Sequence, residues 1–329
     1  MDPLVTQTYD NLSRYTNSFS ESKCIGHFQF GKLYRTKFRH PDRERHFVVK
    51  IWENGYNLLR LADEIILLRH ELILGHPSMV PMYGFCADGE HLCAMYVFQA
   101  SDSVYNLIPK DSFTWLQRIK VSLGIASLLK FLHTGYPQYP PFVVRNLDAA
   151  HILLDENGYP RLCDFSMITG GILPDRTLDK NDNVHGCYGH MDPYSGKKGN
   201  CSDKQDVFAY GVILLGLITK KVYTHENRQV RLPFDHEWAQ REYKASESDS
   251  DKKTVQRSLV HESFTSDPDF NSADGAEITA MAMECINICD SERPTMKQVL
   301  RSLLTLPVVK QHAPFLGVNK LLQPHKIGH

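Results

Sequence analysis

The sequence predicts an α+β protein with two lobes, a small β-rich N-terminal lobe that contains one helix and a larger, mainly helical C-terminal lobe. Short segments of β-branched and aromatic residues are concentrated between residues 24 and 98. Long stretches with apolar residues at helical spacing follow from residue 99. We therefore expect an N-terminal extension over 1–23, lobes over 24–98 and 99–312, and a tail over 313–329.

The small lobe is predicted from four strands and one helix. Runs of β-branched and aromatic residues, bounded by Gly, Pro, Asp and Asn, predict strands over 32–38, 46–52, 82–87 and 92–98. Between the second and third runs, residues 58–74 repeat Leu and Ile at helical spacing without Gly or Pro. This order predicts a small sheet with one helix packed on it.

The large lobe is predicted from helices over 115–133, 207–219, 276–288 and 295–304. The apolar run at 207–219 is shorter than the about 20 residues that span a bilayer, so we expect a buried helix and no transmembrane segment. The acidic, Ser-rich residues 227–274 predict an exposed loop or a partly disordered insertion. The tail is expected to be frayed.

Charge and cysteine usage exclude several classes of protein. The 37 basic and 38 acidic side chains give a formal net charge of -1, which argues against a nucleic-acid or polybasic membrane surface. The eight cysteines lack paired C-x-x-C spacing, so neither a disulfide scaffold nor a metal site is predicted. The first residues carry acids and no basic, apolar leader, so we expect a cytoplasmic protein.

Four segments occur in a fixed order and spacing. They are IGHFQFGKLY at 25–34, VVKI at 48–51, FVVRNLDAAHILLD at 142–155 followed by RLCDFS at 161–166, and GCYGHMDPY at 186–194 with DVFAYG at 206–211 and ERP at 292–294. Taken alone, the glycine-rich segment could be a hairpin turn, and the lysine could be a solvent-exposed end of a strand. Together, from roughly Cys24 to Leu304, they resemble the signature set of protein kinases. The last group is similar to the corresponding segments of plant Pelle-like receptor kinases.

The resemblance implies a vestigial ATP-binding site. Gly26 and Gly31 match the loop whose backbone approaches the phosphates, and Phe28 stands at the second glycine. Lys50 matches the lysine that holds the α- and β-phosphates, and Asp164 matches the metal-binding aspartate. The helical partner of the lysine is Glu64 or Glu71, which are seven residues apart on one helix face, and the spacing does not decide between them.

The positions that carry the chemistry are changed. Asn146 stands at the catalytic aspartate and cannot act as a base, and Val144 stands at the histidine that precedes it. Asp148 replaces a lysine and would place negative charge near the γ-phosphate. The imidazole of His151 is a poor ligand for Mg²⁺ and reads as a hydrogen-bonded structural group. With Ser166 at the last glycine of the D-F-G motif, these changes predict no catalytic residue, and no cofactor beyond weak residual ATP binding.

Three matched positions are structural. Arg145 and Asp206 keep the identities of the kinase scaffold, and Asp206 is expected to cap its helix and to hold the backbone of the catalytic loop. Arg293 normally pairs with a glutamate, and Tyr194 replaces that glutamate. We therefore expect this pair to be broken.

His151 and Ser166 also resemble one plant group, the ZED-related (ZRK) pseudokinases. The resemblance implies an inactive cytoplasmic adaptor or decoy in plant immunity that is recruited to the plasma membrane in a complex. Its implied partners are a coiled-coil NLR immune receptor and a receptor-like cytoplasmic kinase modified by a bacterial effector, or the effector itself. The small-lobe helix and the activation segment over 164–193 are the expected contact surfaces. The alternatives are a weakly active or atypical Ser/Thr kinase, since Lys50 and Asp164 survive, and a passive scaffold.

Overall fold

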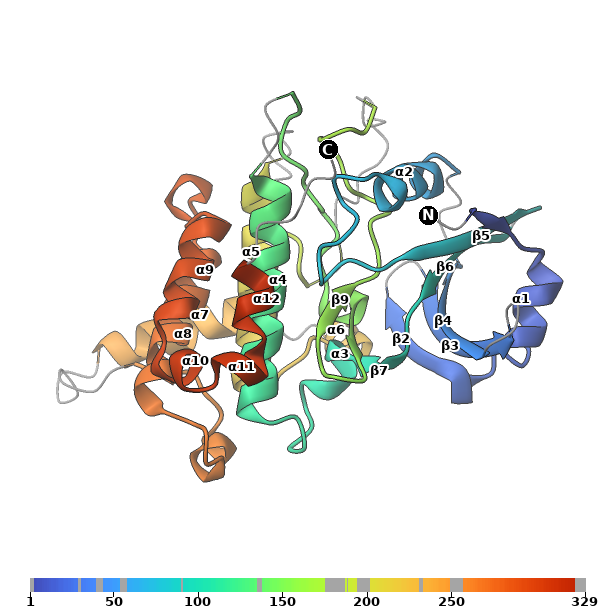
Figure 1. Ribbon diagram of the computed structural model, residues 1–329. Coiled ribbons are helices and arrows are strands. Elements are labelled where there is room, and N and C mark those ends of the chain that lie inside the picture. The colour runs from blue at the N-terminus through green and yellow to red at the C-terminus, as the bar shows by residue number, and fades with distance from the viewer. Residues whose placement is uncertain are drawn as a thin grey trace.

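The structure is a computed structural model that describes residues 3–28, 31–39, 44–53, 58–89, 91–134, 138–174, 187, 189–193, 202–230, 233–248 and 257–322. The described residues form a small lobe built on a sheet and a large lobe built of helices (Figure 1). The predicted two-lobed α+β class is confirmed.

The small lobe contains a six-stranded sheet in the order β1-β5-β6-β4-β3-β2. Its strands are β1 (Val5–Thr6), β2 (Cys24–Phe28), β3 (Gly31–Arg39), β4 (Glu44–Trp52), β5 (Met82–Asp88) and β6 (His91–Val97). Helix α2 (Leu58–Arg69) packs on the sheet and ends five residues earlier than predicted, because residues 71–75 form turns. The four predicted strands are present, each shifted by no more than two residues at either end.

The residues before Cys24 are part of this lobe. Strand β1 pairs in parallel with β5, and helix α1 (Tyr9–Tyr15) lies at the outer side of the sheet, where it buries Leu12 (Figure 1). The backbones of strands β1 and β5 approach closely, which is possible because residue 84 is a glycine. A Cβ atom on Gly84 would lie 2.2 Å from the carbonyl oxygen of Val5.

Two buried helices form the centre of the large lobe. Helix α4 (Trp115–His133) begins with a capping box between Thr114 and Gln117, and helix α5 (Asp203–Thr219) begins after Ser202. Both are apolar nearly all round, which is typical of helices that are covered on every side. Around them lie α3 (Val104–Leu107), α6 (His225–Gln229), α7 (Asp235–Ser248), α8 (Ser272–Cys285) and α9 (Met296–Thr305).

A second, three-stranded sheet lies where the two lobes meet. Its order is β7-β8-β9, with β7 (Ala100–Ser103), β8 (Ile152–Asp155) and β9 (Pro160–Leu162). The short 3₁₀ helix η2 (Ala149–His151) leads directly into β8. This arrangement places the segment 142–155 between the two lobes (Figure 1).

The expected loop over 227–274 is wrong for most of its described residues. Helix α7 occupies 235–248 and buries Ala239, and the 3₁₀ helix η5 (Glu262–Ser266) buries Phe264. The rings of Phe264 and Phe270 lie 5.3 and 4.9 Å from that of Trp115, so these aromatic residues anchor an otherwise polar segment to α4. Residues 249–256 lie outside the described residues.

The expectation of a frayed tail is also wrong as far as residue 322. Helices α10 (Pro307–Gln311), α11 (Ala313–Leu316) and α12 (Val318–Leu322) continue the fold and bury Leu316 and Leu321. Helix α11 packs against α4. Of the helices that the structure describes, none is both long enough and apolar enough to cross a membrane.

Candidate functional site

Lys50 is the centre of a buried polar cluster. It lies on β4, and its Nζ atom is 2.5 Å from Oε2 of Glu64 on α2 and 2.7 Å from Oδ1 of Asp164. All three side chains are 0% exposed. Glu71, the alternative partner, is exposed and lies beyond the end of α2. The geometry therefore selects Glu64 as the partner of Lys50.

The protein holds the lysine in its charged form. Burial acts to lower the pKa of Lys50, but the adjacent carboxylates of Asp164 and Glu64 outweigh it, and the pKa is raised. Burial raises the pKa of Glu64, and the charge of Lys50 offsets only part of this effect. The second oxygen of Glu64 accepts hydrogen bonds from the Tyr96 hydroxyl at 2.6 Å and from the Phe165 backbone N–H at 3.3 Å.

Both oxygens of Asp164 are occupied by protein groups. Oδ1 accepts from Lys50 and from the Ser166 backbone N–H at 3.0 Å. Oδ2 accepts from the Asn146 side-chain amide at 2.9 Å and lies 3.4 Å from Nε2 of His151. Burial acts to raise the pKa of Asp164, but the charge of Lys50, together with the neighbouring His151, outweighs it and lowers this pKa to about 2.

Asp206 fixes the backbone that carries Asn146. Its carboxylate accepts hydrogen bonds from the backbone N–H groups of Val144 at 2.7 Å and Arg145 at 2.8 Å, and it contacts Nε2 of His133 at 2.9 Å. Arg145 has a φ of 69°, a left-handed conformation that is rare for a residue other than glycine. The carboxylate holds the loop as expected, but the N-cap of α5 is Ser202.

His151 and Asp148 are both engaged within the loop. His151 Nδ1 lies 2.9 Å from the backbone oxygen of Asn146, so the imidazole joins the loop to Asp164. Asp148 caps η2 by accepting from the Ala150 backbone N–H at 2.8 Å, and its other oxygen lies 3.6 Å from Nδ1 of His190. Neither side chain depends on a ligand for its orientation.

The two glycines of the first segment have different surroundings. A Cβ atom on Gly26 would lie 3.5 Å from the backbone oxygen of Ala150, so β2 rests directly on η2. The Asn106 side-chain amide donates to the backbone oxygen of Ile25 at 3.1 Å and holds the strand there. A Cβ atom on Gly31 would lie 1.8 Å from the Ile51 oxygen, so the sheet itself requires this glycine. Phe28 is a backbone member of β2, and its side chain lies outside what the structure describes.

Arg293 has a buried carboxylate partner that the sequence analysis missed. Its Nη1 atom is 2.7 Å from Oδ2 of Asp192 and also donates to the backbone oxygen of Lys204, while its Nε donates to the backbone oxygen of Asn287. The Asp-Pro dipeptide at 192–193 was the available signal, because an acidic residue already stood two positions before Tyr194. Tyr194 itself lies outside the described residues.

The donors around Asp164 do not fit a magnesium ion. Mg²⁺ takes oxygen ligands in octahedral geometry. Here an amide N–H and an imidazole nitrogen face Oδ2, while an ammonium group and a backbone N–H face Oδ1. A metal at this carboxylate would have to displace at least one of these contacts.

The two-lobed fold and the Lys50–Glu64–Asp164 cluster are those of a protein kinase. Residues 19–303 match the family model of protein tyrosine and serine/threonine kinases, and the chain belongs to this family. This result confirms the predicted kinase fold.

Several plant kinases are similar in sequence. The probable serine/threonine-protein kinase PBL7 of Arabidopsis thaliana is 30% identical over 66% of this chain and 58% of its own length. The serine/threonine-protein kinase PBS1 of the same plant is 30% identical over 65% of this chain and 47% of its own length. The chain thus spans about half the length of these relatives.

A solved structure has the same fold. The pseudokinase domain of BIR2, described as an immune regulator of the RLK/Pelle family, aligns with a TM-score of 0.65 over 96% of this chain and 92% of that one. Its sequence identity of 21% supports the shared fold alone.

Proposed function

We propose that this chain is a pseudokinase, a member of the kinase family that transfers no phosphate. The observation that carries the proposal is the surroundings of Asp164: its buried carboxylate accepts three hydrogen bonds from protein groups, and Nε2 of His151 lies 3.4 Å from Oδ2. Phosphotransfer depends on this aspartate holding Mg²⁺ and on a second carboxylate accepting the hydroxyl proton. Asn146 occupies the place of that second carboxylate and donates its N–H to Asp164 instead.

Contact between the lobes supports the same proposal. In an active kinase the glycine-rich loop covers the phosphates of the nucleotide. Here β2 is a neighbour of η2, with room at Gly26 for little more than a Cβ atom before Ala150, and Asn106 ties Ile25 to the large lobe. A nucleotide would have to separate these elements, so we expect weak ATP binding at most.

The test is a pair of measurements on the purified full chain. We expect ATP with Mg²⁺ to leave the melting temperature unchanged and to yield no phosphate transfer to the chain or to a generic substrate. A ligand that binds the native state must raise the melting temperature. A shift of several degrees would contradict the expected weak ATP binding, and transfer that disappears in Lys50→Met at an unchanged folded fraction would contradict the proposed loss of phosphotransfer.

A weakly active Ser/Thr kinase is the second candidate. One observation favours it, because the Lys50–Glu64 ion pair that active kinases need is formed at 2.5 Å. Transfer that requires Lys50 would select this candidate over the first.

We propose further that the chain is an adaptor or decoy of the ZRK type, located in the cytoplasm and recruited to the plasma membrane in its complex. By resemblance, its partners are a coiled-coil NLR receptor with leucine-rich repeats and an effector-modified receptor-like cytoplasmic kinase or the effector. The effector-modified kinase, or the effector, is expected to contact the activation segment over 164–193. Residues 175–186 and 188 of this segment lie outside the described residues.

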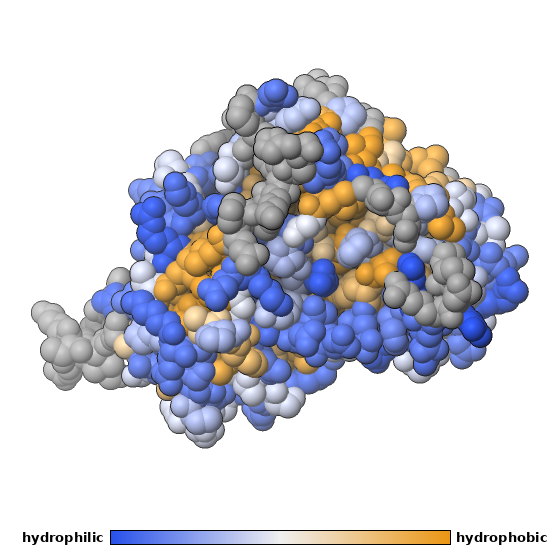
Figure 2. All heavy atoms as spheres, in the orientation of Figure 1, coloured by the Kyte–Doolittle hydropathy of each residue, from blue (hydrophilic) through white to orange (hydrophobic). Residues whose placement is uncertain are grey.

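The receptor surface that fits this proposal is α2 and the turn after it. Leu58, Leu59, Ile66 and Leu74 are 39 to 53% exposed, and Figure 2 shows apolar atoms gathered at the upper part of the small lobe, where α2 lies in Figure 1. Apolar side chains on one exposed helix are typical of contact surfaces.

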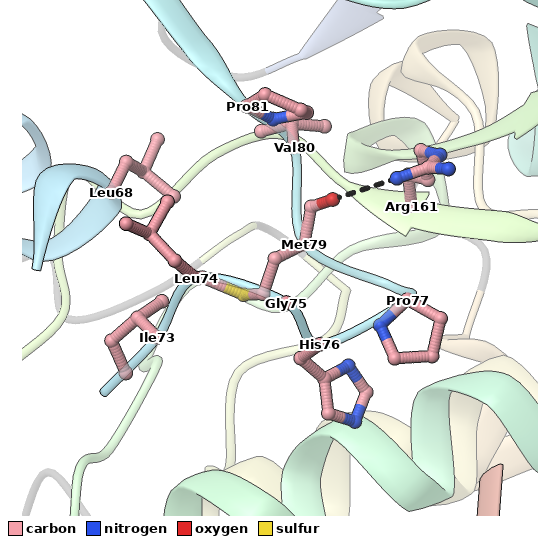
Figure 3. Close-up of a pocket in the computed structure, with 10 residues that line it drawn as sticks. All are labelled: Leu68, Ile73, Leu74, Gly75, His76, Pro77, Met79, Val80, Pro81 and Arg161. Atoms are coloured by element: carbon pink, nitrogen blue, oxygen red, sulfur yellow. Dashed lines mark hydrogen bonds between the residues drawn. The ribbon is translucent and has the colours of Figure 1, made fainter. Parts of the chain in front are cut away.

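A hollow next to this patch can accept a partner's side chain. It has a volume of about 270 Å³ and lies between the end of α2 and β9, with Leu68, Ile73 and Leu74 on one side and Arg161 on the other (Figure 3). Arg161 donates to the backbone oxygen of Met79 at 3.0 Å, which holds the wall of the hollow in place. A well-packed anchor in such a pocket typically contributes above about 2 kcal/mol.

Co-precipitation with NLR receptors from plant tissue tests the adaptor role. We expect Leu59→Glu to abolish the association and Ile288→Glu to preserve it. Leu59 and Ile288 are 53% and 51% exposed and lie on different lobes, so the second variant is a matched control. If Leu59→Glu and Ile288→Glu reduced co-precipitation equally, α2 would not be the receptor-binding surface. If no NLR receptor co-precipitated with the wild type, a passive scaffold would describe this protein better than an adaptor.

A further inference from the structure

Three side chains of metal-binding type meet on the small lobe, outside the kinase site. Glu21 belongs to the 3₁₀ helix η1 (Glu21–Lys23), and Cys24 and His27 belong to β2. Cys24 Sγ lies 3.4 Å from His27 Nε2, and His27 Nε2 lies 3.6 Å from Glu21 Oε2. All three ligand atoms lie within 4.8 Å of one another.

An irregularity in β2 brings Cys24 and His27 together. Residues three apart on a regular strand point to opposite faces of the sheet. The pairing of β2 with β3 shifts register between Cys24 and Gly26, which adds one residue to β2. The shift therefore places Cys24 and His27 on one face, next to Glu21 at the preceding turn.

The spacing of the ligand atoms fits a tetrahedral zinc ion. With Zn–S near 2.3 Å and Zn–N or Zn–O near 2.1 Å, a tetrahedral site separates neighbouring ligand atoms by about 3.4 to 3.6 Å. The Cys24–His27 and His27–Glu21 separations, 3.4 and 3.6 Å, are close to these values, and the Cys24–Glu21 separation is at most 4.8 Å. Lys32 contacts the other oxygen of Glu21, Oε1, at 3.4 Å, so Oε2 remains directed at His27.

We propose that Cys24, His27 and Glu21 bind one Zn²⁺ ion, with water as the fourth ligand. Sulfur and imidazole ligands favour zinc over magnesium or calcium. On binding, the Cys24 thiol releases its proton to solvent and the thiolate bonds the metal. The absence of C-x-x-C spacing does not exclude this site, because its ligands are held by η1 and the irregular strand.

The site would act on β2, the strand that contacts the large lobe. Cys24 and His27 flank Ile25 and Gly26, the residues that contact Asn106 and η2. A zinc ion would tie this strand to η1. This inference stands apart from the loss of phosphotransfer, since the ligands belong to no part of the kinase chemistry.

Cobalt spectroscopy on the chelator-treated full chain tests the proposal. We expect Co²⁺ to give a thiolate-to-cobalt charge-transfer band and tetrahedral ligand-field bands that saturate at one equivalent and disappear when Zn²⁺ is added. Cys24→Ser should abolish the charge-transfer band. His27→Gln should weaken binding at least as much as the about 10- to 100-fold loss typical of an outer-shell partner.

Cys289→Ser is the matched control, because Cys289 is an exposed thiol of the large lobe. This variant should keep the band at full intensity. Melting temperatures measured without metal establish that each variant is folded, and Zn²⁺ should raise the melting temperature of the wild type but not of Cys24→Ser. No band in the wild type, or a band that survives Cys24→Ser, would overturn the proposal.

Discussion

His151 Nε2 lies 3.4 Å from Oδ2 of Asp164, the carboxylate that matches the metal-binding aspartate of kinases. The other ring nitrogen contacts the backbone oxygen of Asn146, so the imidazole spans from the catalytic loop to the aspartate. In the buried cluster Glu64 and Asp164 bring two negative charges and Lys50 brings one positive charge. The imidazole and the Asn146 amide both face Oδ2 of Asp164, whereas Lys50 contacts Oδ1.

Replacement of Lys50 by methionine should destabilise the fold strongly. The change leaves Glu64 and Asp164 buried together without their cation, and removal of one member of a buried ion pair costs about 3–5 kcal/mol. Urea unfolding measures the loss. Lys37→Met is the control, because its pair with Glu44 is exposed and should cost less than about 1 kcal/mol. Equal losses in the two variants would show that the buried cluster contributes little.

Asn146→Asp should destabilise the chain without creating a kinase. The change replaces the N–H that Asp164 accepts with a second buried carboxylate, and an unsatisfied buried group costs about 1–3 kcal/mol, or more when it is charged. Phosphotransfer should stay absent because Asp148 and His151 remain. Urea unfolding and a transfer assay measure both effects, and Asn157→Asp, at an exposed position, is the control. Unchanged stability together with gained transfer would contradict this account.

Acid should remove the contribution of Asp164 to stability. Its pKa is about 2 in the folded chain against an ordinary 3.8, so its contribution is fully present above about pH 4 and is lost as the pH falls towards 2. The shift corresponds to about 2 kcal/mol. The contribution of Glu64 to stability changes with pH in the opposite direction. Its pKa is raised in the folded chain, so it stabilises the fold more as the pH falls.

A comparison with the Asp164→Asn variant separates the contribution of Asp164 from the rest of the pH dependence of stability. The amide mimics the protonated acid, so the stability difference between wild type and variant should be largest near neutral pH and should shrink below about pH 4. A difference that is constant from about pH 6 to 2 would show that the pKa is not lowered.

Gly84→Ala should displace the first strand. The added Cβ atom would lie 2.2 Å from the backbone oxygen of Val5, and overpacking of this kind typically costs about 1–3 kcal/mol. Thermal and urea unfolding measure the change. Gly26→Ala is a control on another strand, because its nearest contact would be an ordinary 3.5 Å. An equal loss at Gly26 would show that the close approach of Gly84 to Val5 is not the cause of the destabilisation.

The sequence was sufficient to predict the cluster at the cleft, with one choice left open. Lys50 and Asp164 could be identified because the apolar residues before Lys50 and the Asp-Phe pair at 164–165 match kinase motifs in the expected order. Glu64 and Glu71 share one helical face, so spacing could not separate them. In the structure α2 ends at Arg69, so Glu71 lies outside the helix and Glu64 is the partner. Apolar periodicity alone defines the ends of helices poorly.

Other parts of the fold carry weaker signals. Strand β1 has two residues, too few for alternation to be visible. Helix α7 was missed because its charged residues suggested a loop, although Ala, Gln, Arg, Glu and Lys within it favour helix. The juxtaposition of Cys24 and His27 could not be predicted at all, since it depends on a register shift that the sequence does not display.

The packing of α11 on α4 also has a consequence for synthesis on the ribosome. Phe315 lies over Lys120 of α4, with its ring centroid 4.6 Å from Nζ, and Leu316 is buried. Translation produces α4 long before α11 emerges, so this face of α4 stays uncovered while most of the large lobe is being made. Transiently exposed apolar surface is what chaperones bind in nascent chains. The large lobe should therefore complete its folding only after the residues of α11 have left the exit tunnel.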